Sequence, residues 1–202
     1  MRLSGRPWLL LAVLVLGCTP ASLPSPPPAP AGRIAVLPPN NRTGDPLLVA
    51  SNSFWDPYTA SSQPVTVADV LAAEARSQLE RRGFTVVAAD AVAAVVGEAP
   101  LNSPQEAAEL VARSKLADAA LWIEITRWEP DMQIHPKLVL VALEASLIDT
   151  ATGNLVWSVH RPLRPTPTPG AISLWTAHLI AAHDVVAELL AGWKSEQPAR
   201  RE

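Results

Sequence analysis

The chain has 202 residues, which is enough for one compact domain and leaves little room for a second. Apolar residues make up 49% and charged residues 17% of the chain, so a sizeable core can be buried and wholesale disorder is excluded. The formal net charge is −3, which argues against nucleic-acid binding because that function needs a clustered electropositive face. A single cysteine excludes an intramolecular disulfide and any cysteine-rich metal site.

The N-terminus has the layout of a secretory signal peptide. Residues 1–6 carry two arginines and no acid, and residues 8–16 form an unbroken apolar run of nine. A helix that spans a bilayer needs about 20 apolar residues, so this run is too short for a permanent membrane anchor. Residues 1–17 are therefore predicted to be a signal that is removed.

The only cysteine lies at the end of this run, in Val15-Leu16-Gly17-Cys18. This segment resembles the bacterial lipobox, although Leu16 stands where that motif usually has a small residue. The resemblance implies that Cys18 is acylated and becomes the first residue of a lipid-anchored protein. Each acyl CH₂ buried in a membrane contributes ~0.8 kcal/mol, so several acyl tails give stable anchoring. The alternative interpretation is a passenger thiol within the signal.

Thr19 and the segment that follows it predict which membrane holds the protein and how far its domain reaches from that membrane. In the lipoproteins that this segment resembles, an Asp after the cysteine favours retention in the inner membrane, so Thr19 favours the outer membrane, facing the periplasm. Residues 18–32 contain six prolines and are predicted to be an extended tether. At ~3.1 Å per residue it reaches up to ~40 Å. A single domain is then predicted over residues 33–194, followed by a polar tail over residues 195–202.

The first half of that domain is predicted to contain two strands and three helices. Helix starts are indicated by a capping box at Thr66 and Asp69, and by Ser103 followed by Pro104 and Glu106. Gly83 suits the end of the first of these helices. The predicted elements are a strand at 33–37, a helix from 66 to about 82, a strand at 84–88, a short helix capped by Asp90 that ends at Gly97, and a helix from 103 to about 115.

Three strands and one helix are predicted for the second half. The strands cover residues 120–128, 138–148 and 155–160, and each alternates apolar and polar residues. In the first of them Leu121, Ile123 and Ile125 face one side, and Trp122, Glu124, Thr126 and Trp128 face the other. Residues 149–154 are predicted to close a hairpin, in which Gly153 accepts a positive φ. Residues 161–170 read as a proline-rich break.

A final helix carries an apolar stripe at spacings of three and four, which predicts packing across the sheet. A coiled-coil dimer seam is the alternative use of that stripe. Its members are Ile172, Trp175, Leu179, Ala182, Val186, Leu189 and Trp193. The predicted fold is therefore α+β, or a small α/β sandwich, with a mixed and mostly antiparallel sheet packed by helices.

No catalytic, cofactor or metal site is predicted. His178 and His183 are five residues apart on a helix and do not share a ligand face. There is no glycine-rich phosphate loop and no serine in a nucleophile-elbow setting. Glu124 and Glu144 lie on neighbouring predicted strands, and paired carboxylates can perform acid–base chemistry. A solvated pair of charges is the simpler interpretation.

Three segments together resemble a group of bacterial envelope lipoproteins. They are Arg33-Ile34-Ala35-Val36-Leu37-Pro38-Pro39-Asn40-Asn41, Leu116-Ala117-Asp118-Ala119-Ala120-Leu121-Trp122-Ile123 and Ser146-Leu147-Ile148-Asp149-Thr150-Ala151-Thr152-Gly153-Asn154-Leu155-Val156-Trp157-Ser158. The group includes uncharacterised lipoproteins, the curli-secretion lipoprotein CsgG and the N-terminal domain of TolB. The resemblance implies a lipid-anchored periplasmic α/β domain that assembles with other envelope proteins, and it does not imply an enzyme.

The leading hypothesis is a non-catalytic scaffold or accessory subunit of a cell-envelope assembly. It is expected to bind the membrane through its lipid and to bind envelope proteins or further copies of itself, without nucleic acid. Phe54, Trp55 and Tyr58 are candidate partner contacts, because exposed aromatic residues anchor interfaces, although they can equally cover the end of the sheet. Two alternatives remain, an activator of a peptidoglycan synthase and an envelope hydrolase that uses Glu124 and Glu144.

Overall fold

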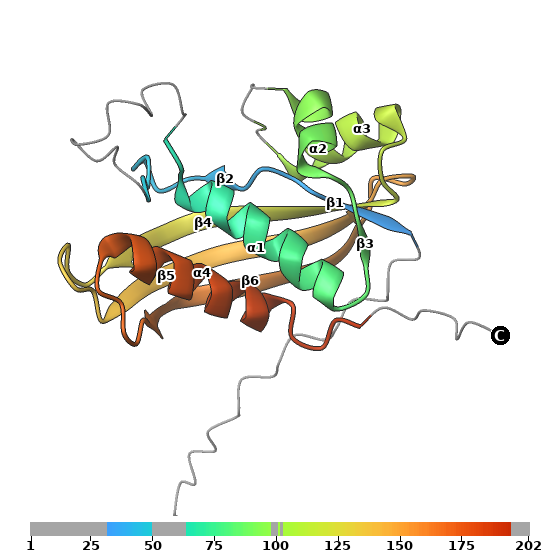
Figure 1. Ribbon diagram of the computed structural model, residues 1–202. Coiled ribbons are helices and arrows are strands. Elements are labelled where there is room, and N and C mark those ends of the chain that lie inside the picture. The colour runs from blue at the N-terminus through green and yellow to red at the C-terminus, as the bar shows by residue number, and fades with distance from the viewer. Residues whose placement is uncertain (1–31, 50–63, 98–100, 102, 195–202) are drawn as a thin grey trace, which may run out of the picture.

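The computed structural model describes residues 32–49, 64–97, 101 and 103–194. Within these residues the chain forms one mixed sheet packed against helices, so the predicted fold class is confirmed (Figure 1). The predicted signal peptide, Cys18, almost all of the predicted tether, and the polar tail lie outside the described residues. So do the candidate contacts Phe54, Trp55 and Tyr58.

The described elements follow the predicted order, with one short strand added. They are β1 (Arg33–Val36), β2 (Asn40–Asn41), α1 (Val67–Arg81), β3 (Thr85–Val86), α2 (Ala89–Val96), α3 (Pro104–Ser114), β4 (Ala119–Pro130), β5 (Leu138–Asp149), β6 (Leu155–Pro167) and α4 (Leu174–Leu189). The strand order is β3-β1-β4-β5-β6, and β2 continues along β4 beyond the end of β1. β1 is parallel to β3 and β4, whereas β4, β5 and β6 form an antiparallel meander.

Side-chain caps fix the starts of three helices. Thr66 and Asp69 form the predicted capping box of α1, and the Ser103 hydroxyl accepts a hydrogen bond from the Glu106 amide at the start of α3. Ser173 and Thr176 form a corresponding capping box at α4. The prediction for α2 was wrong in detail, because the helix begins at Ala89 and its N-cap, Ala88, offers no side-chain hydrogen bond.

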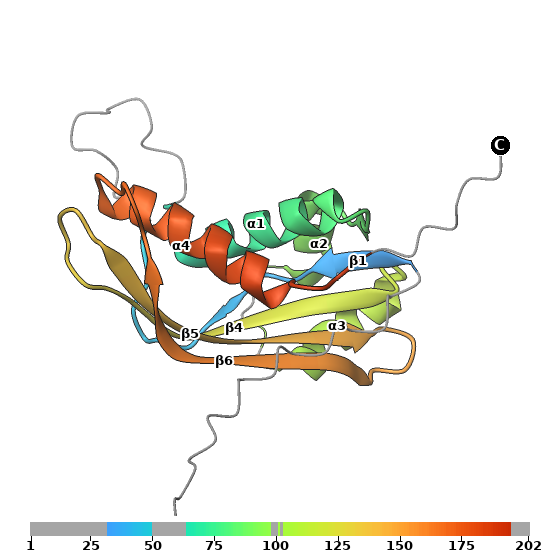
Figure 2. The same ribbon diagram turned by 90° about the horizontal axis from the view of Figure 1, so that it is seen from below.

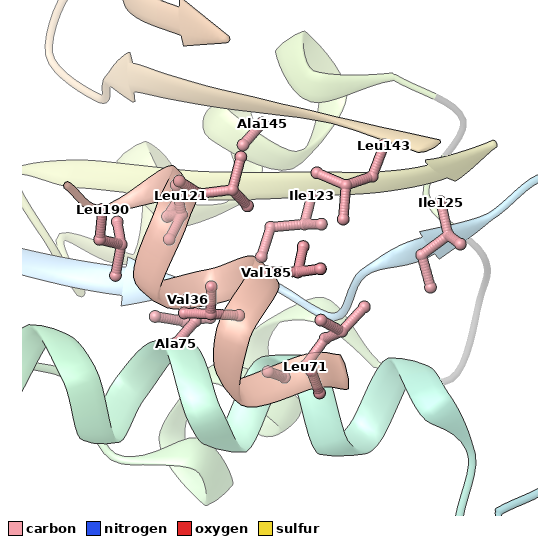
Figure 3. Packing of buried hydrophobic residues seen from close by; sticks show 14 of the residues in the cluster. Val36, Leu71, Ala75, Leu121, Ile123, Ile125, Leu143, Ala145, Val185 and Leu190 are labelled. Atoms are coloured by element: carbon pink, nitrogen blue, oxygen red, sulfur yellow. The ribbon is translucent and has the colours of Figure 1, made fainter. Parts of the chain in front are cut away.

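Helices cover the two faces of the sheet unequally. α1 and α4 pack on one face, where the larger core contains apolar side chains of β1, β4 and β5, including Val36, Leu121 and Leu143 (Figures 2 and 3). α2 and α3 pack on the other face over Ala35, Leu37, Ala120 and Trp122. Their cover ends there, so no helix of the described part of the chain lies over the second face of β4, β5 and β6 beyond Trp122 (Figure 2).

One predicted side-chain orientation in β4 was wrong. Trp128 was expected on the face opposite Leu121, Ile123 and Ile125, yet it is buried in the same core as they are. The cause is a β-bulge, because Ile125 is opposite Leu143 but Arg127 is opposite Ala142, which leaves Thr126 as an extra residue. An extra residue reverses the alternation for the rest of the strand.

The predicted proline-rich break at 161–170 was also wrong for most of its length, because β6 runs on to Pro167. Pro165 and Pro167 stand opposite Leu140 and Leu138, while Pro162 lies in a bulge. This is possible because β6 is the last strand of the sheet, where a residue without an N–H loses no bond to a further strand.

The buried face of α4 differs from the predicted stripe. Ala182, Val186, Leu189 and Trp193 are buried as expected, but Ile172, Trp175 and Leu179 are 74%, 39% and 36% exposed. In the first half of the helix, Ala177, His178 and Ala181 are buried instead. The small alanines let α4 approach the sheet closely. The side of the helix that carries them is therefore buried, and the larger side chains of the neighbouring side stay exposed.

Candidate interaction surfaces

The face of the sheet beyond Trp122 carries a row of ionisable side chains from three strands and from the residue that follows β2. Glu124 of β4 stands directly opposite Glu144 of β5, which stands opposite His160 of β6. Arg42, next to β2, pairs with Glu124 at 2.5 Å, and His160 Nδ1 lies 3.2 Å from Glu144 Oε1. The hydrogen bond and the charge of Glu124 raise the pKa of Arg42. We call these four residues the charged row.

The structure thus brings together the two carboxylates that the sequence singled out, and it also gives each a basic partner. Glu124 has an exposed side-chain fraction of 15% and Glu144 of 55%, so the row lies at the surface and is not enclosed in a cleft. Exposed ion pairs of this kind contribute little stability. Two adjacent carboxylates thus lie between two basic side chains, an arrangement that suits contact with a partner of complementary charge.

The histidines serve separate contacts. His178 is buried in the core, and burial lowers the pKa of its imidazole to about 4. His183 Nδ1 lies 2.9 Å from Glu74 Oε1, which joins α4 to α1. Within the described ranges, no three His, Cys, Asp or Glu side chains are placed to hold a metal ion. The same ranges contain no helix that is both long enough and apolar enough to cross a bilayer.

Arg161 is a structural residue that sequence reasoning missed. Its guanidinium is 4% exposed, and it donates to Glu188 Oε2 at 3.0 Å, to Val141 O at 2.5 Å and to Thr166 Oγ1 at 2.8 Å. It therefore ties the proline-rich half of β6 to both β5 and α4. No local sequence pattern marks it, since Glu188 is 27 positions away.

The second exposed feature is apolar and lies at one end of the molecule. The start of α4 and the β4–β5 hairpin lie at the same end in both views (Figures 1 and 2). Thr168, just before α4, bonds to the hairpin through Pro136 O at 3.0 Å and Lys137 O at 2.8 Å. Besides the exposed residues of α4, the hairpin exposes Met132 at 44% and Ile134 at 75%.

A hollow lies between α1 and α2, at the end of β1. It has a volume of about 150 Å³ and is lined by Pro38, Pro39, Ala72, Arg76 and Val92, among others. Burial lowers the pKa of Arg76. The carboxylate of Asp69, which also lines the hollow, is taken up by the cap of α1, so the hollow offers no reactive pair of groups.

The described domain is therefore an α/β sandwich with an exposed charged row and an exposed apolar end. Residues 55–182 match the family model described as "Putative lipoprotein GNA1162-like", so the chain is a member of this lipoprotein family. The expected kinship with uncharacterised bacterial lipoproteins is thereby confirmed. No curated protein matches the chain.

Several solved structures are distantly similar. Lipoprotein GNA1162 from Neisseria meningitidis is 20% identical, with coverage of 80% of this chain and 98% of that one and a TM-score of 0.47. The PelC dodecamer from Paraburkholderia phytofirmans is 18% identical, with coverage of 86% and 96% and a TM-score of 0.45. The LpoB C-terminal domain from Salmonella enterica is 17% identical, with coverage of 69% and 84% and a TM-score of 0.41. These likenesses are too distant to transfer a function.

Proposed function

We propose that this protein is a lipid-anchored, non-catalytic scaffold or accessory subunit of a bacterial cell-envelope assembly, located in the outer membrane and facing the periplasm. The observation that carries the proposal is membership of a lipoprotein family together with a lone cysteine, Cys18, at the end of a short apolar run. Acylation of Cys18 holds the domain at the membrane, and residues 18–32 act as the tether.

The charged row supports the accessory role. It lies on the one part of the sheet that no described helix covers, so it is open to a partner of complementary charge. Both carboxylates of the row already have basic partners, which argues against their use as an acid–base pair in hydrolysis. Envelope proteins are the partners we expect at this face.

Lipid anchoring is tested by the intact mass of the membrane-extracted protein, with wild type and Cys18→Ala compared. We expect the wild-type mass to lack residues 1–17 and to include acyl groups, and the variant to be unacylated. An unacylated wild-type protein would contradict the proposal. As a control, Glu144→Gln removes a charge from the charged row. This variant should still be acylated, which would show that processing does not depend on that surface.

Partner binding is tested by a photo-crosslinking residue placed at Ser158, which is exposed beside His160 on β6, in intact cells. The matched control carries the same residue at Ala73, exposed on α1. We expect crosslinks to another envelope protein from Ser158 and none from Ala73. Equal products from both positions, or none from either, would contradict a partner at the charged row.

Two narrower proposals depend on the same assay. If the crosslinked protein is a peptidoglycan synthase, purified lipoprotein should raise its rate in reconstitution, which is the activator alternative. An envelope hydrolytic activity that disappears in Glu124→Gln with folding intact would instead overturn the non-catalytic role. The relation to CsgG and the TolB N-terminal domain stays a prediction based on the three sequence segments.

A further inference from the structure

The first half of α4 has an apolar side that the core does not use. Trp175 and Leu179 are four residues apart and lie on one side of the helix, and Ile172 precedes the helix, next to its N-cap Ser173. All three side chains are exposed. We call them the α4 ridge. The same stripe continues into Ala182 and Val186, which are fully buried.

The cause of this change along the helix is visible in the contacts of α4. Two contacts join α1 to His183 of α4, because Gln78 Nε2 donates to the His183 carbonyl at 3.0 Å and Glu74 Oε1 lies 2.9 Å from His183 Nδ1. These contacts hold α4 to α1 near the middle of α4. The ridge lies before that point, at the end of the molecule shared with the β4–β5 hairpin (Figures 1 and 2).

We propose that the α4 ridge is the contact between two copies of this chain, with α4 packed antiparallel to α4 of a second copy across a twofold axis. The interface is isologous, so each Trp175 meets the ridge of the other copy. A tryptophan at the centre of a small interface is the residue type that contributes most to binding. The inference concerns the described domain and holds whether or not Cys18 is acylated.

The charges of α4 favour a second copy of the chain over a lipid surface as the partner of the ridge. Leu174–Leu189 contains no Lys or Arg, and its only carboxylates, Asp184 and Glu188, lie beyond the ridge. Helices that lie on a lipid surface are rich in Lys and Arg on their polar face, so this helix does not fit a membrane. Two copies of a chain with a formal net charge of −3 repel each other through their charged surfaces, so contact between them is least opposed where the surface carries no charge.

The area of the exposed apolar surface also fits a second copy of the chain. The ridge with Met132 and Ile134 of the hairpin exposes roughly 500 Å² of apolar surface, which is comparable with the largest apolar patch on a typical monomer. Such patches are often functional. A standard interface buries about 800 Å² on each partner, somewhat more than half of it apolar, so the ridge and the hairpin together supply the apolar part.

The test measures the mass of the full-length protein in detergent by sedimentation or native mass spectrometry over a range of concentrations. Wild type is expected to be a dimer, and Trp175→Glu is expected to raise the dissociation constant at least about 100-fold, since both copies lose the anchor. The matched control is Leu163→Glu on β6, whose native side chain is 53% exposed, and it should remain a dimer. Circular dichroism confirms that each variant is folded.

A second measurement uses Leu179→Cys in a Cys18→Ala background, so that position 179 carries the single thiol of the chain. A bismaleimide should link two chains through position 179 and should not link chains that carry Leu163→Cys. A monomeric wild type would overturn the proposal, as would a dimer that Leu163→Glu breaks and Trp175→Glu leaves intact. A monomer whose binding to anionic vesicles is lost in a Trp175→Glu, Cys18→Ala double variant, relative to Cys18→Ala alone, would assign the ridge to lipid and overturn it equally.

Discussion

Trp128 Nε1 donates a hydrogen bond of 2.9 Å to His178 Nδ1, which joins β4 to α4 inside the core. The bond needs an unprotonated Nδ1, and burial supplies that condition because it lowers the pKa of His178 to about 4. Protonation would place a charge in the core and would remove the acceptor of the Trp128 indole. The contact between sheet and helix is therefore sensitive to acid.

We expect the free energy of unfolding to fall as the pH drops from about 6.5 to about 4. An unfolded histidine titrates near 6.5, so between these values the unfolded chain binds more protons than the folded one. The loss attributable to His178 is about 2 kcal/mol by pH 4.5. Urea denaturation at pH 7.5 and pH 4.5 measures it. His178→Asn keeps an acceptor without a titrating ring, and an equally steep loss in that variant would contradict the assignment.

Arg161 and Arg164 both pair with Glu188, but they should contribute very differently to stability. Arg161→Ala removes a buried cation and leaves Val141 O and Thr166 Oγ1 without their hydrogen-bond donor. This should lower the free energy of unfolding by about 3 kcal/mol. Arg164→Ala breaks a pair that is 48% exposed at the arginine and should cost less than about 1 kcal/mol. Urea denaturation compares the two, and equal losses would show that the buried contacts of Arg161 are not the stabilising ones.

Pro165 should protect the edge of the sheet against intermolecular pairing. Pro165→Thr restores an outward N–H on the last strand, so we expect faster aggregation on warming with a change in unfolding free energy within about 1 kcal/mol. Light scattering follows the aggregation. Pro104→Ala, at the start of α3 and away from the edge, is the matched control and should aggregate at the wild-type rate.

Gly153 closes the β5–β6 hairpin with φ of +71°, and a Cβ added there would meet no atom within 4 Å. The cost of Gly153→Ala therefore comes from the backbone conformation alone and should be about 1 kcal/mol. Gly153→Asn should cost less, because asparagine tolerates this region better. Thermal denaturation ranks the two variants, and an equal melting temperature for Gly153→Ala and wild type would contradict this account.

Local signals predicted the elements that depend on local chemistry. Thr66 with Asp69, and Ser103 with Glu106, start α1 and α3 as expected because a cap is a contact between residues three positions apart. The turn at Asp149 also formed as expected, since Thr152 donates to its carboxylate and lowers the pKa of Asp149. These interactions need no information from the rest of the fold.

The errors arose where tertiary position decides the outcome. The bulge at Thr126, which buries Trp128, has no signal in the sequence, and prolines in β6 are tolerated only because that strand is at the edge. The exposure of Trp175 depends on where α1 supports α4. Of the candidate site, the sequence identified Glu124 and Glu144. Their partners, Arg42 beside β2 and His160 on β6, are brought to them by strand pairings that only the fold defines.

The pairing of β1 has a consequence for how the chain acquires its structure. Ile34 stands beside Val86 on one side and Ala119 on the other, and the Arg33 amide donates to Asp118, 85 positions away. A chain that is made from its N-terminus can pair β1 with β3 only after residue 86, and with β4 only after residue 119, has been synthesised. Such long loops must close before any pairing is gained, so the first strand is integrated late and folding is slow. Nascent chains truncated before Ala119 should therefore remain sensitive to protease.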